Sequence, residues 1–544
     1  MPPKDSSCNR NAEDLKTQGN ELFHQKQYQP AHRKYTEAIK ADPANAVYYA
    51  NRAACSLASK EYLDAAADAI KATELDPNYA KAWSRLATAS HQLTSYGKSV
   101  NAWETALKCL PPLEQSSETD KKLRAQFTAG LAEAQKEKDT PIMQNETMRH
   151  VPAGQQMPWH RAAAMESELI AQQKVSSEFK EGVTSMKKLE KTITADGKSR
   201  YMGKAGTLVH ISNAVMRDSR VFHFDSSDWI IKYNEQVIFE AELHKAWVHG
   251  GAKTIKEEAP KRLKREGWHK VRPALSTTIR AWLMCGVLSK VTGKYATSIE
   301  YYSRTLDVLE WGARTWQKVS AADRGVIFSK TFIRGARRMK LAAMHSCVMN
   351  KVQGVDITSD EMADFARELI AETDANPPDA ADEPLDIGFA GSFWMYPKGD
   401  ALSVLAWHYM QLGHNSTTSE GAQAAYSQSA ECYIQAAQSY PLDEEQTIVF
   451  YKVALEAYWF SPQGKKLEDM IPLFFLISEQ LPHVTKIWEH SEDAIGRDAQ
   501  LMQALNFEKR CEDALKCGKI ALDMLVKPKE IEHKTKWKGN FVYI

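Results

Sequence analysis

The sequence predicts an all-α protein that begins with a solenoid of stacked helical hairpins. Two observations support this prediction. Along most of the chain apolar residues recur three and four positions apart, as in amphipathic helices, and no convincing set of strands appears. Near the N-terminus, Pro43, Pro77 and Pro111 lie 34 residues apart, and each stands just past an amphipathic stretch, where proline ends a helix.

The proline period defines three repeats, residues 12–45, 46–79 and 80–113. Small residues stand where two helices would cross closely, and large residues fill the space between them. These packing positions are Leu15, Gly19, Ala31, Tyr35 and Ala38 in the first repeat, Ala53, Ala65, Ala69 and Ala72 in the second, and Trp83, Ala87, Trp103 and Ala106 in the third. The pattern resembles the tetratricopeptide repeat (TPR) family, which implies three helix–turn–helix hairpins. Ser99 replaces the family's alanine and predicts a slightly looser third hairpin.

The segments around these repeats complete the first domain. Residues 1–11 are polar, and we expect them to be disordered. A solenoid needs a cap on its last apolar face, and residues 117–138 provide an amphipathic helix with Leu123, Phe127 and Leu131 on one side. Residues 139–158 are polar and punctuated by proline, which is typical of a linker.

The remaining chain is predicted to be mostly helical. Residues 159–370 form a helical domain, in which the stretch from Gly293 is similar to the second helix of a divergent TPR hairpin; an ordinary helical hairpin is the alternative. Residues 371–390 are acidic and contain prolines, so we expect a loop. Residues 391–526 form a second helical, TPR-like domain, in which Ser429, Tyr433, Ala436 and Pro441 repeat the family pattern. The basic tail, 527–544, is expected to be solvated.

Five polar residues carry the candidate site. Lys16 and Asn20 are four residues apart, as are Lys81 and Arg85, so each pair lies on one face of a helix. Asn51 stands between them, and the 34-residue period brings all five to neighbouring helices. Together these side chains supply positive charge and directional amide donors, which are what two closely spaced carboxylates need if they are to leave water.

These five positions match the carboxylate clamp that TPR co-chaperones share. The resemblance implies that this clamp binds the Glu-Glu-Val-Asp tail of the cytosolic seventy- and ninety-kilodalton heat-shock chaperones. Phe23, one turn beyond Asn20, is a candidate wall for the aliphatic residue of that tail, although an aromatic residue there also serves the hairpin core. The expected role is peptide binding, with no catalytic, metal or cofactor site.

TPR domains can be fused to enzymes, so catalytic motifs were sought in the rest of the chain. Residues 321–326, AADRGV, are faintly similar to one phosphatase motif but lack the companion segments of a two-metal site. No HExxH, Walker A, GxSxG or dinucleotide-binding fingerprint appears. The sequence therefore predicts a protein that is not an enzyme.

Charge and hydropathy exclude other classes of partner. The formal net charge is +1, and no apolar run approaches the length of a membrane span. We therefore predict a cytoplasmic protein that binds neither nucleic acid nor membrane. The favoured hypothesis is a non-enzymatic co-chaperone whose helical remainder binds an unknown second partner. A general TPR scaffold for other acidic C-termini and, less favoured, an enzyme with an unrecognised site in residues 159–544 are the alternatives.

Overall fold

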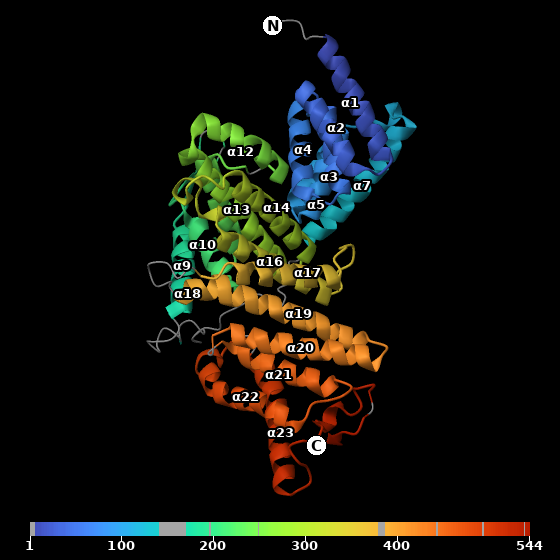
Figure 1. The fold of residues 1–544 in the computed structure, drawn as a ribbon. Coiled ribbons are helices and arrows are strands. Elements are labelled where there is room, and N and C mark those ends of the chain that lie inside the picture. Colours follow the sequence, from blue (N-terminus) through green and yellow to red (C-terminus); the bar gives the residue numbers. More distant parts are fainter. Residues whose placement is uncertain are drawn as a thin grey trace. The chain divides into compact units, whose positions relative to one another are not determined.

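The computed structural model describes residues 6–140, 161, 170–194, 197, 199–247, 250–378, 387–441, 444–491, 494–537 and 539–544. The chain divides into two compact units, one made of Met1–Met148 with Asn234–Ser329 and the other of Arg149–Tyr233 with Lys330–Ile544. Regular structure in the described ranges is almost entirely helical, which confirms the predicted all-α fold class (Figure 1).

Six helices of the first unit form three antiparallel hairpins, blue to cyan in Figure 1. They are α1 (Ser6–His24) with α2 (Tyr28–Ala41), α3 (Ala46–Ala58) with α4 (Tyr62–Leu75), and α5 (Ala80–Gln92) with α6 (Tyr96–Lys108). Each hairpin turns through one residue with a positive φ, and these residues, Lys26, Lys60 and Thr94, recur at the same period as the prolines. Helix α1 starts at Ser6, so helical structure extends into the segment that we expected to be disordered.

Close crossings inside the hairpins explain the small residues of the pattern. A Cβ atom placed on Gly19 would lie 2.8 Å from the ring of Tyr35, so only glycine lets α1 and α2 approach this closely. Ser99 is fully buried, and its hydroxyl donates to the carbonyl of Ala87 at 2.9 Å. The expected looser packing of the third hairpin is therefore wrong, because the backbone satisfies the extra polar group.

The hairpins end on a capping helix, α7 (Glu118–Asp139), which follows a short 3-10 turn, η1 (Leu113–Gln115). Ser117 and Asp120 form a reciprocal capping box at the start of α7. Phe127 is buried against Trp103, with Leu123 and Leu131 packed around them, as predicted. Of the linker predicted at 139–158, residues 141–158 lie outside the described ranges.

The rest of the first unit, residues 234–329, contains a fourth helical hairpin. The elements of this segment are the later part of α11 (Trp229–His244), α12 (Ala252–Glu266), α13 (Trp268–Val291), α14 (Tyr295–Thr315), α15 (Ala321–Arg324) and η3 (Val326–Phe328). Helices α13 and α14 pair as α1 and α2 do. Gly286 lies under the ring of Tyr302, Ser298 donates to the carbonyl of Gly286 at 2.7 Å, and the turn residue Gly293 has a φ of 74°.

Helices α12 and α14 pack on α4, the second helix of the second hairpin. Arg304 and Lys253 lie against a group of three carboxylates formed by Glu61, Asp64 and Glu300. The backbone N–H groups of Lys253 and Leu63 donate to Asp64 and Glu300, at 2.8 and 3.4 Å. Residues 234–329 therefore belong with the N-terminal hairpins and not with the rest of the predicted 159–370 domain.

The second unit begins with helices around a small hairpin of strands. In order these are α9 (Ile170–Lys187), β1 (Glu190–Ile193), β2 (Ser199–Met202), α10 (Thr207–Arg217), η2 (Ser219–Val221) and the start of α11, followed after residue 329 by α16 (Lys330–Met349) and α17 (Ser359–Ala375). Strands β1 and β2 are antiparallel, with Glu190 opposite Met202. This correction to the strand-free prediction is local, since both strands are mostly exposed.

The second unit continues with a stack of long helices, orange to red in Figure 1. They are α18 (Ile387–Ala390), the π-helix η4 (Gly391–Met395), α19 (Tyr396–Asn415), α20 (Ser419–Ser439), α21 (Glu445–Phe460), α22 (Leu467–Trp488) and α23 (Ala494–Lys516). Ser429 is buried, and its hydroxyl donates to the carbonyl of Ala406 on the preceding helix. In the third hairpin Ser99 makes the equivalent hydrogen bond to Ala87. Of the loop predicted at 371–390, 371–375 belong to α17, 387–390 form α18 and 379–386 lie outside the described ranges.

The C-terminal tail differs from the solvated segment that we expected. Strand β3 (Val526–Lys527) pairs in parallel with β4 (Val542–Tyr543), on either side of η5 (Lys529–Ile531). Lys527 is fully buried, and its amino group donates to the carbonyl of Ser461 at 2.8 Å. Burial lowers the pKa of this amino group to about 8. The basic composition of the tail did not predict this burial. The charge of Lys527 is accommodated by the carbonyl of Ser461 and by the ring of Phe541, over which its amino group lies.

Candidate functional site

The five predicted residues, Lys16, Asn20, Asn51, Lys81 and Arg85, lie on the first helices of the three hairpins. We call them the clamp cluster. Lys16 and Asn20 come from α1, Asn51 from α3, and Lys81 and Arg85 from α5. On α3 and α5, Ala50 and Ala82 are fully buried and face the core between the hairpins. The polar residues next to them, Asn51 and Lys81, therefore lie nearer the surface.

Hydrogen bonds join three members of the clamp cluster across three helices. The Asn51 side-chain amide donates to Oδ1 of Asn20 at 3.3 Å, and Arg85 Nη1 donates to Oδ1 of Asn51 at 3.4 Å. The Tyr35 hydroxyl also donates to Oδ1 of Asn20, at 2.7 Å. Both amide oxygens are therefore occupied inside the protein.

The clamp cluster retains hydrogen-bond donors that no described residue uses. With its oxygen taken twice, Asn20 keeps its Nδ2 amide group without a protein partner in the described part of the chain. The side chain of Lys81 is exposed and forms no hydrogen bond or ion pair with any described residue. A surface with positive and amide donors but no spare acceptor is suited to an anion with several oxygen atoms.

Arg85 is the most unusual charge in the cluster. Besides Asn51 it donates to the hydroxyl of Tyr79, and no carboxylate pairs with it among the described residues. Burial lowers the pKa of its guanidinium, while Tyr79 and Tyr35 act in the opposite direction. A partly buried cation without an anion is unfavourable by itself, and a bound carboxylate would relieve this cost.

Arg52, also partly buried, shows what a satisfied arginine looks like in the same hairpins. Its guanidinium holds Asp68 with two hydrogen bonds of 2.8 and 2.7 Å and donates a third to Thr36 at 3.1 Å. Burial acts to lower the pKa of Arg52, but Asp68 more than offsets this and raises it. Arg52 is therefore a structural residue.

Lys16 and Phe23 are engaged within the protein. Lys16 forms an ion pair with Glu13 one turn earlier, and its side chain remains 23% exposed. Phe23 packs half-buried beside Ala31 and Tyr35 and meets Tyr28 edge to face at 5.4 Å. Phe23 thus serves the hairpin core, and its part in contacting a ligand remains a prediction.

Two residues near the clamp cluster were not predicted as part of the site. Tyr35 was assigned to packing alone, but its hydroxyl reaches Asn20 while its ring packs on Gly19. Tyr79, the residue before α5, reaches Arg85. The only sequence signal was that both residues are tyrosines and not phenylalanines, since a buried hydroxyl needs a polar partner.

Sequence comparison with known proteins identifies the domain that carries the clamp cluster. No family model matches the chain. The chain is 46% identical over 110 residues to the small glutamine-rich tetratricopeptide repeat-containing protein 2 of Saccharomyces cerevisiae, a match covering 20% of this chain and 31% of that protein. It is 39% identical over 106 residues to the HSC co-chaperone sgt12 of Aspergillus fumigatus, again covering 20% and 31%. The N-terminal hairpins form a TPR domain.

A third relative is an enzyme by name. Human serine/threonine-protein phosphatase 5 is 39% identical to the chain over 110 residues, which cover 20% of this chain and 22% of the phosphatase. In all three comparisons the matched segment is less than a third of the relative. The likeness is thus confined to the TPR domain.

The other helices of the first unit use few of the clamp cluster's neighbours for their attachment to the TPR domain, which is mainly at α4. The other helices of that unit approach α4 and the turns after α5, where Thr297 donates to the carbonyl of Gln92 at 3.0 Å. No hydrogen bond or ion pair joins the clamp cluster to the described residues of 234–329. The donors of the clamp cluster are therefore not used to attach the described residues of 234–329 to the TPR domain.

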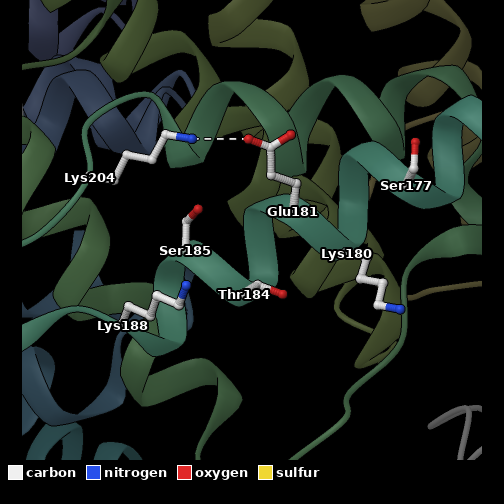
Figure 2. Close-up of a pocket in the computed structure, with 7 residues that line it drawn as sticks. All are labelled: Ser177, Lys180, Glu181, Thr184, Ser185, Lys188 and Lys204. Carbon is white, nitrogen blue, oxygen red and sulfur yellow. Dashed lines mark hydrogen bonds and ion pairs between the residues drawn. The ribbon is translucent and has the colours of Figure 1, made fainter.

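A different polar site occurs in the second unit. Ser177, Lys180, Glu181, Thr184, Ser185, Lys188 and Lys204 line an open pocket on α9 and the segment before α10 (Figure 2). Lys204 is paired with Glu181 at 3.0 Å, so this pocket satisfies part of its own charge. In the described ranges, no group of three or more His, Cys, Asp or Glu residues is arranged to hold a metal ion, and no helix there has the length and apolarity to cross a membrane.

Proposed function

We propose that the protein is a non-enzymatic co-chaperone, or adaptor, whose TPR domain binds the free acidic C-terminal tail of heat-shock chaperones. The observation that carries this proposal is the one-sided chemistry of the clamp cluster. Asn20, Lys81 and Arg85 retain donors without protein acceptors, and Arg85 has no carboxylate partner among the described residues.

The ligand best suited to such a cluster is a chain end that carries two carboxylates. A C-terminal aspartate places its main-chain and side-chain carboxylates a few ångströms apart, and both lose water when they bind. Arg85 can hold one carboxylate with two parallel hydrogen bonds, whereas Lys81 supplies a mobile charge for the other. Lys16 would exchange its exposed partner Glu13 for the ligand at little cost.

The relatives support the same type of partner. A protein named as an HSC co-chaperone is similar to the chain over the TPR domain, and Hsp70-Hsp90 organizing protein 1 of Glycine max is 36% identical over 97 residues. We propose that the chain acts in the cytoplasm, where it recruits such chaperones to whatever the helical remainder binds. The match to the phosphatase covers only 22% of that enzyme and gives no reason to propose catalysis.

Peptide titration of the full chain tests the proposal. We expect a Glu-Glu-Val-Asp peptide with a free C-terminus to bind with a Kd of about 1 to 100 micromolar, and its C-terminal amide to bind at least about tenfold more weakly. The double variant Lys81→Ala with Arg85→Ala should lose most of the binding. The matched control is Lys34→Ala with Lys71→Ala, because both of these lysines lie on second helices and pair with exposed glutamates.

The two possible failures have different meanings. Equal affinity for the acid and the amide would show that the TPR domain does not recognise a chain end, and the proposal would be rejected. Binding of an unrelated acidic C-terminus as tightly as the chaperone tail would instead favour a general scaffold.

A further inference from the structure

A cavity of about 740 Å³ lies in the first unit, where α11 ends, α12 ends and α13 begins. It is on different helices from the clamp cluster and plays no part in the proposed function. Its lining is dominated by cationic and ionisable side chains, with a single carboxylate. The charged residues are Lys245, Arg262, Arg265, Glu266 and Lys270, and the two histidines are His244 and His269.

Arg262 and Glu266 form the framework of the cavity. Arg262 donates to the main-chain carbonyls of His244 at 3.1 Å and Lys245 at 2.6 Å, and to the carboxylate of Glu266 at 2.8 Å. Its guanidinium also lies over the ring of Trp247, 5.2 Å from the ring centre. These contacts fix the end of α11, where Lys245 turns the chain with a φ of 50°. Arg262 is therefore occupied, and it compensates the only carboxylate of the cavity.

The two lysines of the cavity have no such compensation among the described residues. Lys245 and Lys270 are exposed and form no side-chain hydrogen bond or ion pair with a described residue, and His269 is exposed beside them. Arg265 only approaches Glu266, at 3.9 Å, and its side chain is 72% exposed. Glu266 thus serves both arginines, whereas the two lysines form no ion pair in the described part of the chain.

The start of α13 contributes partial positive charge to the cavity, whereas the ends of α11 and α12 contribute partial negative charge beside Lys245 and Arg265. Helix α13 is 24 residues long, and its N-cap residue Gly267 has no side chain with which to cap the first N–H groups. The first turn holds no acidic residue. Instead His269 and Lys270 stand at the end of the helix that already carries partial positive charge. These exposed cations are solvated, and together with the first N–H groups of α13 they offer donors to an anion with several oxygen atoms.

We propose that this cavity binds a compact polyanion that carries phosphate groups. The volume is that of a small-ligand site, and with a net charge of +1 the chain has no extended positive field for a nucleic acid. The two cations without an ion pair are lysines, mobile point charges that suit a polyphosphate, whose oxygens point in many directions. A soluble polyphosphate and the headgroup of a phosphoinositide share this chemistry.

Calorimetric titration of the full chain with tripolyphosphate, at about 0.15 M salt, tests the proposal. We expect saturable binding, with affinity reduced at least about tenfold in Lys245→Gln with Lys270→Gln. The matched control is Lys180→Gln with Lys188→Gln, which removes two lysines from the pocket of Figure 2. If the double variant fails to fold, the exposed single change Arg265→Gln replaces it in the test, and it should weaken binding severalfold.

A second arm separates the two sources of phosphate. Vesicles with and without a phosphoinositide are sedimented with the chain in the presence and absence of tripolyphosphate. Phosphoinositide-dependent sedimentation that tripolyphosphate displaces assigns a lipid headgroup, and calorimetric binding without sedimentation assigns a soluble ligand. The proposal is overturned if neither probe binds, or if the control variant loses as much affinity as the cavity variant.

Discussion

Arg52 and Arg85 are chemically identical side chains with opposite environments in one small domain. Arg52 has its carboxylate inside the protein, whereas Arg85 has two neutral partners and no carboxylate among the described residues. A charge whose partner is internal contributes to the fold. A charge without one is held at the expense of the fold and is available to a ligand.

Substituting each arginine separates these roles. Arg85→Ala should weaken binding of the free acidic peptide by about 2 kcal/mol or more, roughly thirtyfold, with the melting temperature unchanged or slightly raised. Arg52→Ala should lower the unfolding free energy by about 3 kcal/mol, because Asp68 would stay buried and unpaired. Calorimetry and thermal unfolding measure both effects. A large loss of stability in Arg85→Ala would contradict this assignment.

Tyr35 illustrates what the residue pattern could not predict. The five residues of the clamp cluster were predicted from their resemblance to the clamp of TPR co-chaperones, and the 34-residue period explains why they lie on neighbouring helices. The direction of each amide depends on a hydroxyl from another helix, and no spacing rule specifies that contact. The sequence therefore predicted which helices carry the five residues but not the hydrogen-bond polarity among them, and their role in binding stays a prediction.

The substitution Tyr35→Phe tests this polarity. It keeps the ring over Gly19 but removes the donor to Oδ1 of Asn20. We expect peptide affinity to fall about threefold to tenfold, as Asn20 loses its fixed orientation, and stability to fall by about 1 kcal/mol. Tyr28→Phe is the control, since only the ring of Tyr28 has a described contact near the site, with Phe23.

At the scale of the hairpin, one geometry recurs where the sequence signal was faint. Gly19 and Tyr35 are 16 residues apart, and so are Gly286 and Tyr302; the turn residues Lys26 and Gly293 each follow the glycine by seven. The second helix was predicted from its sequence, but α13 was not assigned as its partner. Apolar residues such as Leu283 and Val287 are buried on α13, so that helix lacks the polar face of α1.

Glycine substitutions test this equivalence. A Cβ atom on Gly286 would lie 2.5 Å from the ring of Tyr302, so Gly286→Ala should destabilise the first unit by about 1 to 3 kcal/mol. Gly97, within α6, has nothing within 4 Å of such an atom, and Gly97→Ala should stabilise by about 0.5 to 1 kcal/mol. Denaturant unfolding of the two variants measures both signs. A neutral Gly286→Ala would mean that α13 and α14 do not cross closely.

At the scale of the compact unit, the attachment of 234–329 to the TPR domain depends on a group of charges that composition could not reveal. Glu61 just before α4, Asp64 on α4 and Glu300 on α14 lie against Arg304 and Lys253, so three carboxylates share two cations among the described residues. Burial raises the pKa of Asp64 from 3.8 to about 6 and that of Glu300 from 4.5 to about 7. Residues 237 positions apart in the chain create this site.

The raised pKa values give the first unit a defined pH dependence. The folded state binds more protons than the unfolded state between about pH 4 and pH 7, so its unfolding free energy should fall as the pH rises through this window, by roughly 2 to 4 kcal/mol in total. Asp64→Asn with Glu300→Gln should flatten this dependence and make the unit more stable than the unmodified chain at pH 8. Each amide keeps an oxygen for the N–H groups of Lys253 and Leu63.

The control is Glu74→Gln, an exposed change on α4, the helix that carries Asp64, and it should leave the pH slope intact. The measurement is chemical unfolding at pH 5, 6.5 and 8, followed by hydrogen exchange at Leu63. A pH slope that survives the double substitution would show that other groups set the stability of the unit.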